Sequence, residues 1–479
     1  MIAIVAALVC FTGIAGLLWL DGKRPEGVSK AVWIPFLWIF FAGSRFASQW
    51  WDLGSPEVMG AEEYSDGSPM DRNVFLALML GGVWMLRGRQ IDWSALVKRN
   101  AWLVLFFAFA MISVTWADEP LVAFKRWTKA FGNVIMALIL VTEKRPSEAL
   151  GFVLRRLGYV LLPLSILFIR YFPDLGRAYH MGQPMFTGVT FQKNSLGQLC
   201  LIVGVYVAWR LLVQRVRPPL ASGTAQTVAL IALVAMLAWL LYMAQSATAI
   251  ALMLSIIAFF LLVRLRAFRK RPSRLLVAGI FLAALVVVLE QFVELKDDII
   301  RMLGREPDLT ERTPIWDLVL GLVTHPWIGA GYESFWTGGR MNEIWTRLGV
   351  NLIQSHNGYI DLYLSLGYIG VALLALAIVS GLAKAQKHLR IDYEGSTLRM
   401  SIIFIAVGYN YTEAAFKPLN NIFVLLLFSI LQVERVGEHS GSSQVAPPGS
   451  PKEADGWRSG LEDDRSSRRS ARSTSPSGR

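Results

Sequence analysis

A histidine and an asparagine stand directly in front of a long apolar run in IQSHNGYIDLYLSLGYIG, residues 353–370. Imidazole titrates near neutral pH, so His356 has the chemistry to take a proton from a hydroxyl group. A helix start offers a second explanation, because Asn357 is a favoured N-cap residue and His356 would merely precede it. The motif by itself leaves both explanations open.

Basic residues gather on the side of the membrane where the topology given below places His356. They are Arg170, Arg177, Lys193, Arg301, Arg305, Arg312, Arg340 and Arg347. Guanidinium groups suit phosphate and diphosphate oxygens, and several of them neutralise a diphosphate without a metal ion. The plain alternative is a solvated charged surface.

An acidic segment on the same side, residues 50–72, offers a competing metal site. Its carboxylates lack the spacing of a recognisable ligand set. The two cysteines, Cys10 and Cys200, both fall in apolar runs and supply neither a disulfide framework nor a thiolate site. We therefore expect no metal and no cofactor.

The composition indicates a polytopic α-helical membrane protein. Of 479 residues, 54% are hydrophobic and 17% are charged, against about 25% charged in soluble domains. The interval between Arg217 and Arg264 contains no charged residue. It is long enough for two helices, since a bilayer core takes about 20 apolar residues per span.

Apolar runs and the charges between them predict an all-α bundle of about 12–13 spans. The spans are expected near 2–20, 31–50, 73–86, 101–116, 126–142, 152–171, 194–213, 225–243, 247–263, 275–291, 357–383, 399–415 and 420–433. The first run lacks a basic n-region and a cleavage site, so it is expected to be a retained span.

Lysine and arginine concentrate in one alternate set of the loops, which the positive-inside rule places in the cytoplasm. The N-terminus is then outside and the C-terminus inside. The high formal charge of +12 follows mostly from this topology and the tail. It gives no reason to infer a nucleic-acid partner.

We expect four parts: a membrane bundle at 1–291, an external loop at 292–356, further membrane helices at 357–433 and a disordered cytoplasmic tail at 434–479. The external loop contains a predicted helix that starts near Thr310 to Pro314 and ends at the sequence THP. Its apolar residues fall on one face, which predicts a helix lying over the bundle as a lid. These residues are Ile315, Leu318, Val319 and Leu322.

The other histidines are weaker candidates for chemistry. His388 and His439 fall on the cytoplasmic side, His325 precedes a proline at a helix end, and His180 has no obvious partner. His356 alone lies where the external loop re-enters the membrane.

Five blocks occur in the order found in the O-antigen ligase and polysaccharide polymerase superfamily. They are VTFQKNSLGQL (189–199), LGREPDLTERTPIWDLV (303–319), HPWIGAGYESFW (325–336), SHNGYIDLYLSLGYIG (355–370) and YNYTEAAFKPLN (409–420). The chain most resembles the exopolysaccharide-production branch, which the early block IPFLWIFFAGSRFASQWW also resembles. The resemblance covers roughly residues 30–430.

This resemblance implies a membrane glycosyltransferase of the GT-C type that is inverting and independent of metal. Such enzymes move a glycan from undecaprenyl diphosphate to the hydroxyl of a glycan or lipid-anchored acceptor, on the outer face of the bacterial inner membrane. Membrane lipids and other polysaccharide export proteins are the further partners it implies. The active site would face the periplasm.

The resemblance also implies roles for particular residues. The motif histidine corresponds to His356 as the base, and the motif arginines correspond to Arg312 and Arg305 on the diphosphate. The middle motif corresponds to Lys193 and Asn194.

Two positions depart from the family pattern. Thr187 stands where many relatives have arginine, and Glu311 stands where others have glycine. The first departure leaves open which basic group completes the diphosphate site: Lys193, Arg177 or Arg170.

Two carboxylates near His356 have alternative explanations. Asp361, like Asn357, could orient the imidazole, or it could be a solvated acid in the first turn of the helix. Glu413 is an intramembrane carboxylate and therefore a candidate functional group, or it pairs with Lys417 four positions later. The loop tryptophans Trp316, Trp327, Trp336 and Trp345 are expected to anchor at the interface or stack on sugars.

A transporter or flippase of the same lipid-linked glycan is the alternative function. Transporters often show inverted repeats and charged groups near the membrane midplane. The sequence shows no convincing repeat, and its polar candidates gather at one face, which favours chemistry. A non-catalytic scaffold would not need the arginine and histidine group.

Overall fold

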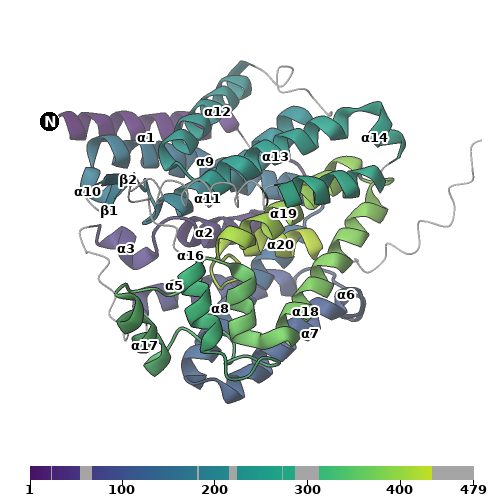
Figure 1. Ribbon diagram of the computed structural model, residues 1–479. Coiled ribbons are helices and arrows are strands. Elements are labelled where there is room, and N and C mark those ends of the chain that lie inside the picture. The colour runs from purple at the N-terminus through teal and green to yellow at the C-terminus, as the bar shows by residue number, and fades with distance from the viewer. Residues whose placement is uncertain are drawn as a thin grey trace, which may run out of the picture. The chain divides into compact units, whose positions relative to one another are not determined.

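The computed structural model describes residues 1–22, 24–53, 67–180, 183–214, 224–271, 273–285, 288 and 312–433. Regular structure in these ranges is almost entirely helical (Figure 1), which confirms the all-α class. Residues 1–433 form one compact unit. The tail at 434–479 lies outside the described residues, so its disorder and the four-part division stay predictions.

The elements before the first strand are α1 (Ile2–Asp21), η1 (Lys30–Val32), α2 (Trp33–Ala42), α3 (Ala47–Trp51), α5 (Pro69–Arg87), α6 (Trp93–Arg99), α7 (Ala101–Ile112), η2 (Ser113–Trp116), α8 (Pro120–Val141), α9 (Pro146–Tyr171) and α10 (Pro173–Gly176). After the strands come α11 (Lys193–Leu212), α12 (Thr224–Ala244), α13 (Ala247–Arg264), α14 (Arg266–Lys270), a helix at Ser273–Leu285, α16 (Arg312–Gly321), α17 (Gly338–Leu348), α18 (Gly358–His388), α19 (Tyr393–Thr412) and α20 (Asn421–Ile430).

A short antiparallel hairpin joins α10 to α11. It consists of β1 (Arg177–His180) and β2 (Gln183–Phe186), with Arg177 opposite Phe186 and Ala178 opposite Met185. The sequence prediction treated this segment as a loop. Each strand of the hairpin has only four residues. This length is too short for an alternation of apolar and polar residues to predict a strand from the sequence.

Each predicted span coincides with helical structure in the described residues, although the spans expected near 31–50 and 420–433 correspond to short apolar helices. Six described helices are long and apolar enough to cross a membrane, and the bent pair Trp93–Arg99 with Ala101–Trp116 would make a seventh. Three shorter apolar helices are Lys30–Ala42, Ser273–Leu285 and Asn421–Ile430. The chain is therefore a multi-pass membrane protein in which several of the predicted spans are short.

The helices differ in how deeply they are packed. In the 18-residue apolar window of α9, 83% of the residues are buried inside the protein, against 6% for α1. Helix α9 contacts α1, α2, α11 and α12, which explains its burial. Helix α1 is apolar around its whole surface and leaves most of it uncovered, as a lipid-facing helix does.

Helix α18 is broken at Gly367, and the loop between α16 and α17 packs against the break. Gly367 has φ 62° and ψ −166°, outside the helical region. Beyond it, the N–H of Tyr368 donates to the carbonyl of Pro326 (2.9 Å). A Cβ on Gly329 would lie 2.4 Å from the backbone of Leu366. Only glycine lets the two backbones approach this closely. The contact holds the first segment of α18, before Gly367, against the loop.

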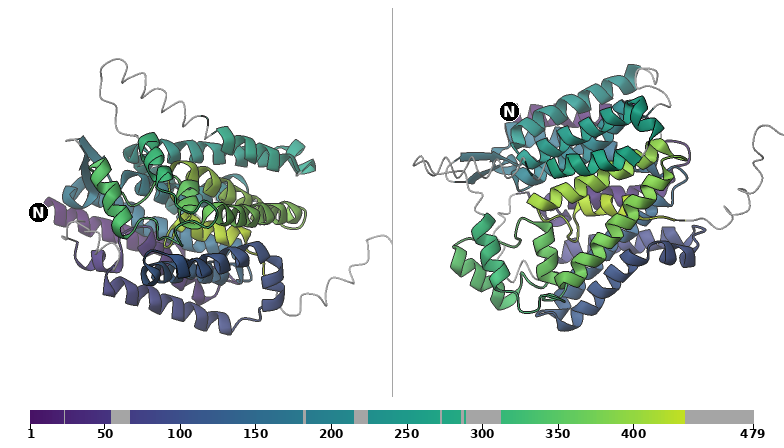
Figure 2. Two further views of the ribbon diagram at one scale, coloured as in Figure 1. Left: turned by 60° about the horizontal axis from the view of Figure 1, so that its bottom comes forward. Right: turned by 45° about the vertical axis from the view of Figure 1, so that its right-hand side comes forward.

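Helices α16 and α17 lie together beside the first segment of α18 (Figures 1 and 2). They enclose a second apolar core that is separate from the core of the bundle. This second core consists of Val319, Phe335, Trp336, Ile344 and Leu364. Ile315, Leu318 and Leu322 pack against it, which confirms the predicted helix and its apolar face. Helix α17 is a second helix of the segment in which amphipathic helices were expected, although its bounds were not predicted.

Candidate functional site

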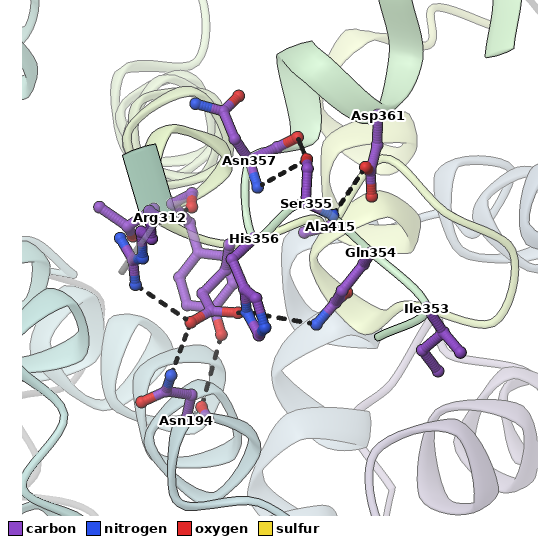
Figure 3. Close-up of polar contacts among 12 residues, drawn as sticks. Asn194, Arg312, Ile353, Gln354, Ser355, His356, Asn357, Asp361 and Ala415 are labelled. Atoms are coloured by element: carbon purple, nitrogen blue, oxygen red, sulfur yellow. Dashed lines mark hydrogen bonds and ion pairs between the residues drawn. The ribbon is translucent and has the colours of Figure 1, made fainter. Parts of the chain in front are cut away.

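Four segments that are distant in the sequence meet beside His356 (Figure 3). Asn194 lies in the first turn of α11, Arg312 begins the described part of α16, and Glu413 directly follows α19. The fourth segment, residues 353–357, carries His356 into α18. All four are helix ends, so polar groups gather at one end of an otherwise apolar bundle.

Glu413 is the centre of this group and is 6% exposed. Its Oε1 accepts a 2.6 Å hydrogen bond from Nδ2 of Asn194 and lies 3.6 Å from Nη2 of Arg312. Its Oε2 lies 3.3 Å from Nδ1 of His356. One buried carboxylate therefore joins a candidate base, a cation and an amide that come from three different elements.

The imidazole of His356 is accessible, with 25% of its side chain exposed. Nε2 of Gln354 also lies 3.5 Å from Nδ1. The Gln354 amide nitrogen can only donate, which favours an unprotonated Nδ1, whereas the Glu413 carboxylate can only accept. Because the bond to the charged carboxylate is the stronger of the two, Glu413 favours the tautomer that carries its proton on Nδ1. The lone pair is then on Nε2, the nitrogen that can accept a proton from a substrate.

His356 adopts a positive φ of 55°, a left-handed conformation that costs free energy for a residue with a Cβ. The flanking residues hold it there. The Ser355 hydroxyl donates to the carbonyl of Asn357 (3.0 Å) and lies 3.3 Å from its N–H. Such strain persists only where surrounding contacts over-determine the backbone, as they often do in functional sites.

Asn357 is the N-cap of α18, as predicted. Its Oδ1 accepts from the N–H groups of Tyr359 (3.0 Å) and Ile360 (3.1 Å), and its Nδ2 donates to the carbonyl of Tyr411 (3.0 Å). Both ends of the amide are therefore engaged within the protein.

Asp361 is a buried residue that contacts the segment carrying His356, not the imidazole. Its Oδ1 accepts from the Ser355 N–H (2.9 Å) and from Nε1 of Trp336 (3.2 Å). Its Oδ2 lies 2.8 Å from Nζ of Lys417. The carboxylate is buried, so the solvated alternative is wrong, and its ion pair is with the lysine that the sequence offered as a partner of Glu413.

The predicted cations divide into two groups. Arg312 contacts Glu413, and Lys193 precedes Asn194 at the start of α11. Arg177 instead donates from Nε (3.0 Å) and Nη2 (2.8 Å) to the Ile169 carbonyl, and the Arg170 guanidinium lies 5.2 Å from the Trp239 ring centroid. These contacts hold the last two against the end of α9 and α12. Arg305 lies outside the described residues.

The remaining candidates contribute little to the site. The carbonyl of His325 accepts from the N–H of Gly329, as expected of a helix end or turn. Asp71, at the end of the acidic segment, accepts from the N–H and hydroxyl of Ser48 (2.8 and 2.6 Å). Residues 54–66 and the side chain of His180 are not among the parts of the chain that the structure describes. The described residues contain no group of three His, Cys, Asp or Glu side chains that could hold a metal.

Three loop tryptophans have a role that the sequence did not suggest. Nε1 of Trp316 donates to the carbonyl of Ser355 (2.8 Å), and that of Trp345 donates to the carbonyl of Leu352. Together with the hydrogen bond from Trp336 to Asp361, these bonds attach α16, α17 and the loop between them to the segment before His356. Trp327 differs: it is 68% exposed. No local signal distinguishes these cases, because each depends on which carbonyl the indole meets in the fold.

Glu333, in the loop between α16 and α17, is a further carboxyl near this group. Burial raises its pKa, and the nearby charge of Asp361 raises it further, while Lys417 and Arg126 lower it. The Arg126 guanidinium also donates to the Glu333 carbonyl. The ionised form of Glu333 is thus disfavoured in the folded protein.

A known protein family matches this region of the chain. The O-antigen ligase family model matches residues 231–375. The matched range contains Arg312, His356 and Asp361, together with α16, α17 and the break in α18. Asn194 and Glu413 lie outside it, although the fold brings both to His356.

A curated relative extends the similarity beyond that range. The chain is 26% identical over 300 residues to the exopolysaccharide production protein ExoQ of Rhizobium meliloti (strain 1021). The match covers 60% of this chain and 66% of the relative, slightly less than two thirds of its length.

Proposed function

We propose that this chain, which belongs to the O-antigen ligase and polysaccharide polymerase family, is a glycosyltransferase that acts on a lipid-linked glycan. The relative is named for exopolysaccharide production, so we extend the proposal to a polymerase or ligase of cell-envelope polysaccharide. The donor we propose is a glycan on undecaprenyl diphosphate, and the acceptor is a sugar hydroxyl. We place the reaction on the outer face of the inner membrane.

One observation carries the proposal: Glu413 contacts His356, Arg312 and Asn194 at the same time. A catalytic base for a sugar hydroxyl and a cation for a diphosphate are thereby held within one cluster. A transporter would not require a histidine held by a carboxylate in a strained conformation at the end of a helix. The cluster therefore favours group transfer over passage.

In the proposed reaction, Nε2 of His356 removes the proton from the acceptor hydroxyl as its oxygen attacks the anomeric carbon. The bond between that carbon and the diphosphate oxygen breaks, and undecaprenyl diphosphate leaves with the bonding electron pair. Attack from the face opposite the leaving group inverts the anomeric centre. The Glu413 carboxylate stabilises the imidazolium that forms, as the acidic member of a catalytic triad does.

Negative charge develops on the departing diphosphate, and fixed cations stabilise it. Arg312 is suited to this role because its guanidinium is already at the site and 12% of its side chain is exposed. Lys193 is our proposal for the second cation, since Arg170 and Arg177 make their described contacts elsewhere. We retain Arg305 as a further candidate on the resemblance alone. The diphosphate is a good leaving group, so no metal is needed in this scheme.

The decisive experiment is reconstitution of the purified chain in proteoliposomes with a defined undecaprenyl-diphosphate oligosaccharide. We expect transfer that persists in excess EDTA. A product ladder that rises by whole repeat units identifies a polymerase, and a single addition to a lipid-anchored acceptor identifies a ligase. Absence of transfer to every acceptor, with transbilayer movement of the donor, would establish the transporter alternative. A strict metal requirement would contradict the mechanism.

A further inference from the structure

Asp361 and Lys417 form a buried ion pair whose contacts converge on the backbone before His356. Asp361 Oδ1 accepts from the N–H of Ser355 at 2.9 Å. Lys417 Nζ lies 2.8 Å from Asp361 Oδ2 and 3.5 Å from the carbonyl oxygen of Ile353. The pair thus reaches two positions, Ile353 and Ser355, of the segment that leads to His356.

The same segment is held from a second side by the external helices. Trp316 of α16 donates its indole N–H to the carbonyl of Ser355, so both backbone polar groups of Ser355 are engaged. Trp336 donates to the same Asp361 oxygen that accepts from Ser355. Ser355 itself is completely buried. Its backbone therefore has little freedom to move without breaking several hydrogen bonds.

We propose that Asp361, Lys417 and Trp316 are positioning residues that place His356 through the backbone of Ser355. The proposal rests on the base role of His356 proposed above. Because His356 is held at positive φ, the direction of its side chain depends on the peptide units on either side. The described contacts of Asp361 supply one of these constraints without contacting the imidazole.

The ion pair also sets His356 relative to Glu413. Lys417 and Glu413 lie in one loop, between α19 and α20, whereas Asp361 and His356 lie on either side of the start of α18. The His356–Glu413 and Asp361–Lys417 contacts therefore connect the same two segments twice. Two connections fix both the distance and the orientation of the base, which one connection could not.

The first test measures transfer by Asp361→Asn, Lys417→Met and Trp316→Phe. Each should lower kcat about 10- to 100-fold, because small misplacements of a base have effects of this size. The KM for the donor should change less than about threefold, because donor-binding cations are untouched. Lys417→Arg keeps the charge and should retain most of the activity. The matched control is Asp118→Asn, which removes the Asp118–Arg340 ion pair at 2.8 Å without touching this segment.

The second test is independent of the proposed function. In this test the other four histidines are replaced by glutamine, which leaves His356 as the single imidazole visible by NMR. The replaced residues are His180, His325, His388 and His439. Asp361→Asn and Trp316→Phe should each shift its ring resonances and its titration midpoint, whereas Asp118→Asn should not. If the wild-type chain shows no transfer, the proposed function fails and this test alone decides the positioning role.

Trp316→Phe keeps an aromatic ring and removes only the hydrogen-bond donor, so it serves where Asp361→Asn fails to fold. Thermal unfolding and gel-filtration profiles identify the folded variants. Folded Trp316→Phe with wild-type kcat and unchanged His356 resonances would overturn the proposal. A donor KM that rises in proportion to the fall in kcat/KM would also overturn it, since it would assign these residues to donor binding.

Discussion

Two groups of ion pairs differ in what the carboxylate holds. Asp21, the last residue of α1, binds Arg155 (2.6 Å) and Arg156 (3.3 Å) of α9. Glu413, directly after α19, binds His356 and Arg312. The first carboxylate is neutralised by two permanent cations. The Glu413 carboxylate instead lies between Arg312, at 3.6 Å, and the titratable imidazole of His356, at 3.3 Å.

Exposure makes the same distinction. The side chains of Asp21, Arg155 and Arg156 are 5–11% exposed, and Nη1 of Arg155 donates to the hydroxyl of Tyr206. That group is closed and joins α1 to α9 and α11. The His356 side chain is 25% exposed, and its partner Glu413 is separated from Arg312 by 3.6 Å. A buried ion pair is thus weak evidence for function unless it contains a base that a substrate can reach.

The largest effect should come from His356→Ala, which removes the proposed base. We expect transfer to fall by about 10²–10⁴-fold, the usual contribution of general base catalysis. The folded protein should persist, because His356 is neither an N-cap nor part of a core. Transfer in proteoliposomes and thermal unfolding measure the two properties. Robust transfer by the folded variant would remove the base hypothesis.

Exchanging the carboxylates one at a time tests the comparison directly. Asp21→Asn should destabilise the fold by about 3–5 kcal/mol, because it leaves two buried arginines without a counter-charge. Its turnover per folded molecule should stay at the wild-type value.

Glu413→Gln should show the opposite pattern, with kcat reduced by at least about tenfold and a smaller loss of stability. The pH–rate profile should also move, because the imidazolium loses its stabilising charge. Equal losses of turnover in the two variants would show that both groups are structural.

Arg312→Gln should act mainly on use of the donor. Loss of one charge-assisted contact to a diphosphate corresponds to about a 10- to 100-fold loss in kcat/KM. Arg347→Gln is the matched control, because Arg347 forms an exposed ion pair with Glu343 within α17. A normal donor response in Arg312→Gln would show that another cation binds the diphosphate.

The smallest effect should come from Glu333→Gln, which probes a carboxyl with no proposed role in transfer. Its pKa is raised in the folded state, so ionisation destabilises the fold progressively as the pH rises through that raised pKa. The variant should unfold about 1–3 °C higher than wild type at pH 7.5. At pH 4 the difference should vanish, because both folded and unfolded states are then largely protonated. A loss of stability at pH 7.5 would contradict this electrostatic account.

Several features could be predicted because they depend on neighbouring residues. The helix at Arg312–Gly321 follows from its apolar spacing, and the Asn357 cap follows from the polar residue before an apolar run. The lengths of individual helices were harder to predict, since short buried helices such as Asn421–Ile430 have the hydropathy of a span without its length. Hydropathy reports how apolar a helix is but not whether lipid or protein covers it.

The sequence by itself determined that this chain is a helical membrane protein, with His356 and a set of arginines as candidates for its chemistry. Only the tertiary structure decided that Glu413 contacts His356, 57 positions away, and Asn194, 219 positions away. It also decided that Asp361 holds the backbone and that Arg170 and Arg177 lie against other helices. The physical reason is that hydropathy and caps act between close neighbours, whereas the partner of a carboxylate depends on which helix ends the packing brings together.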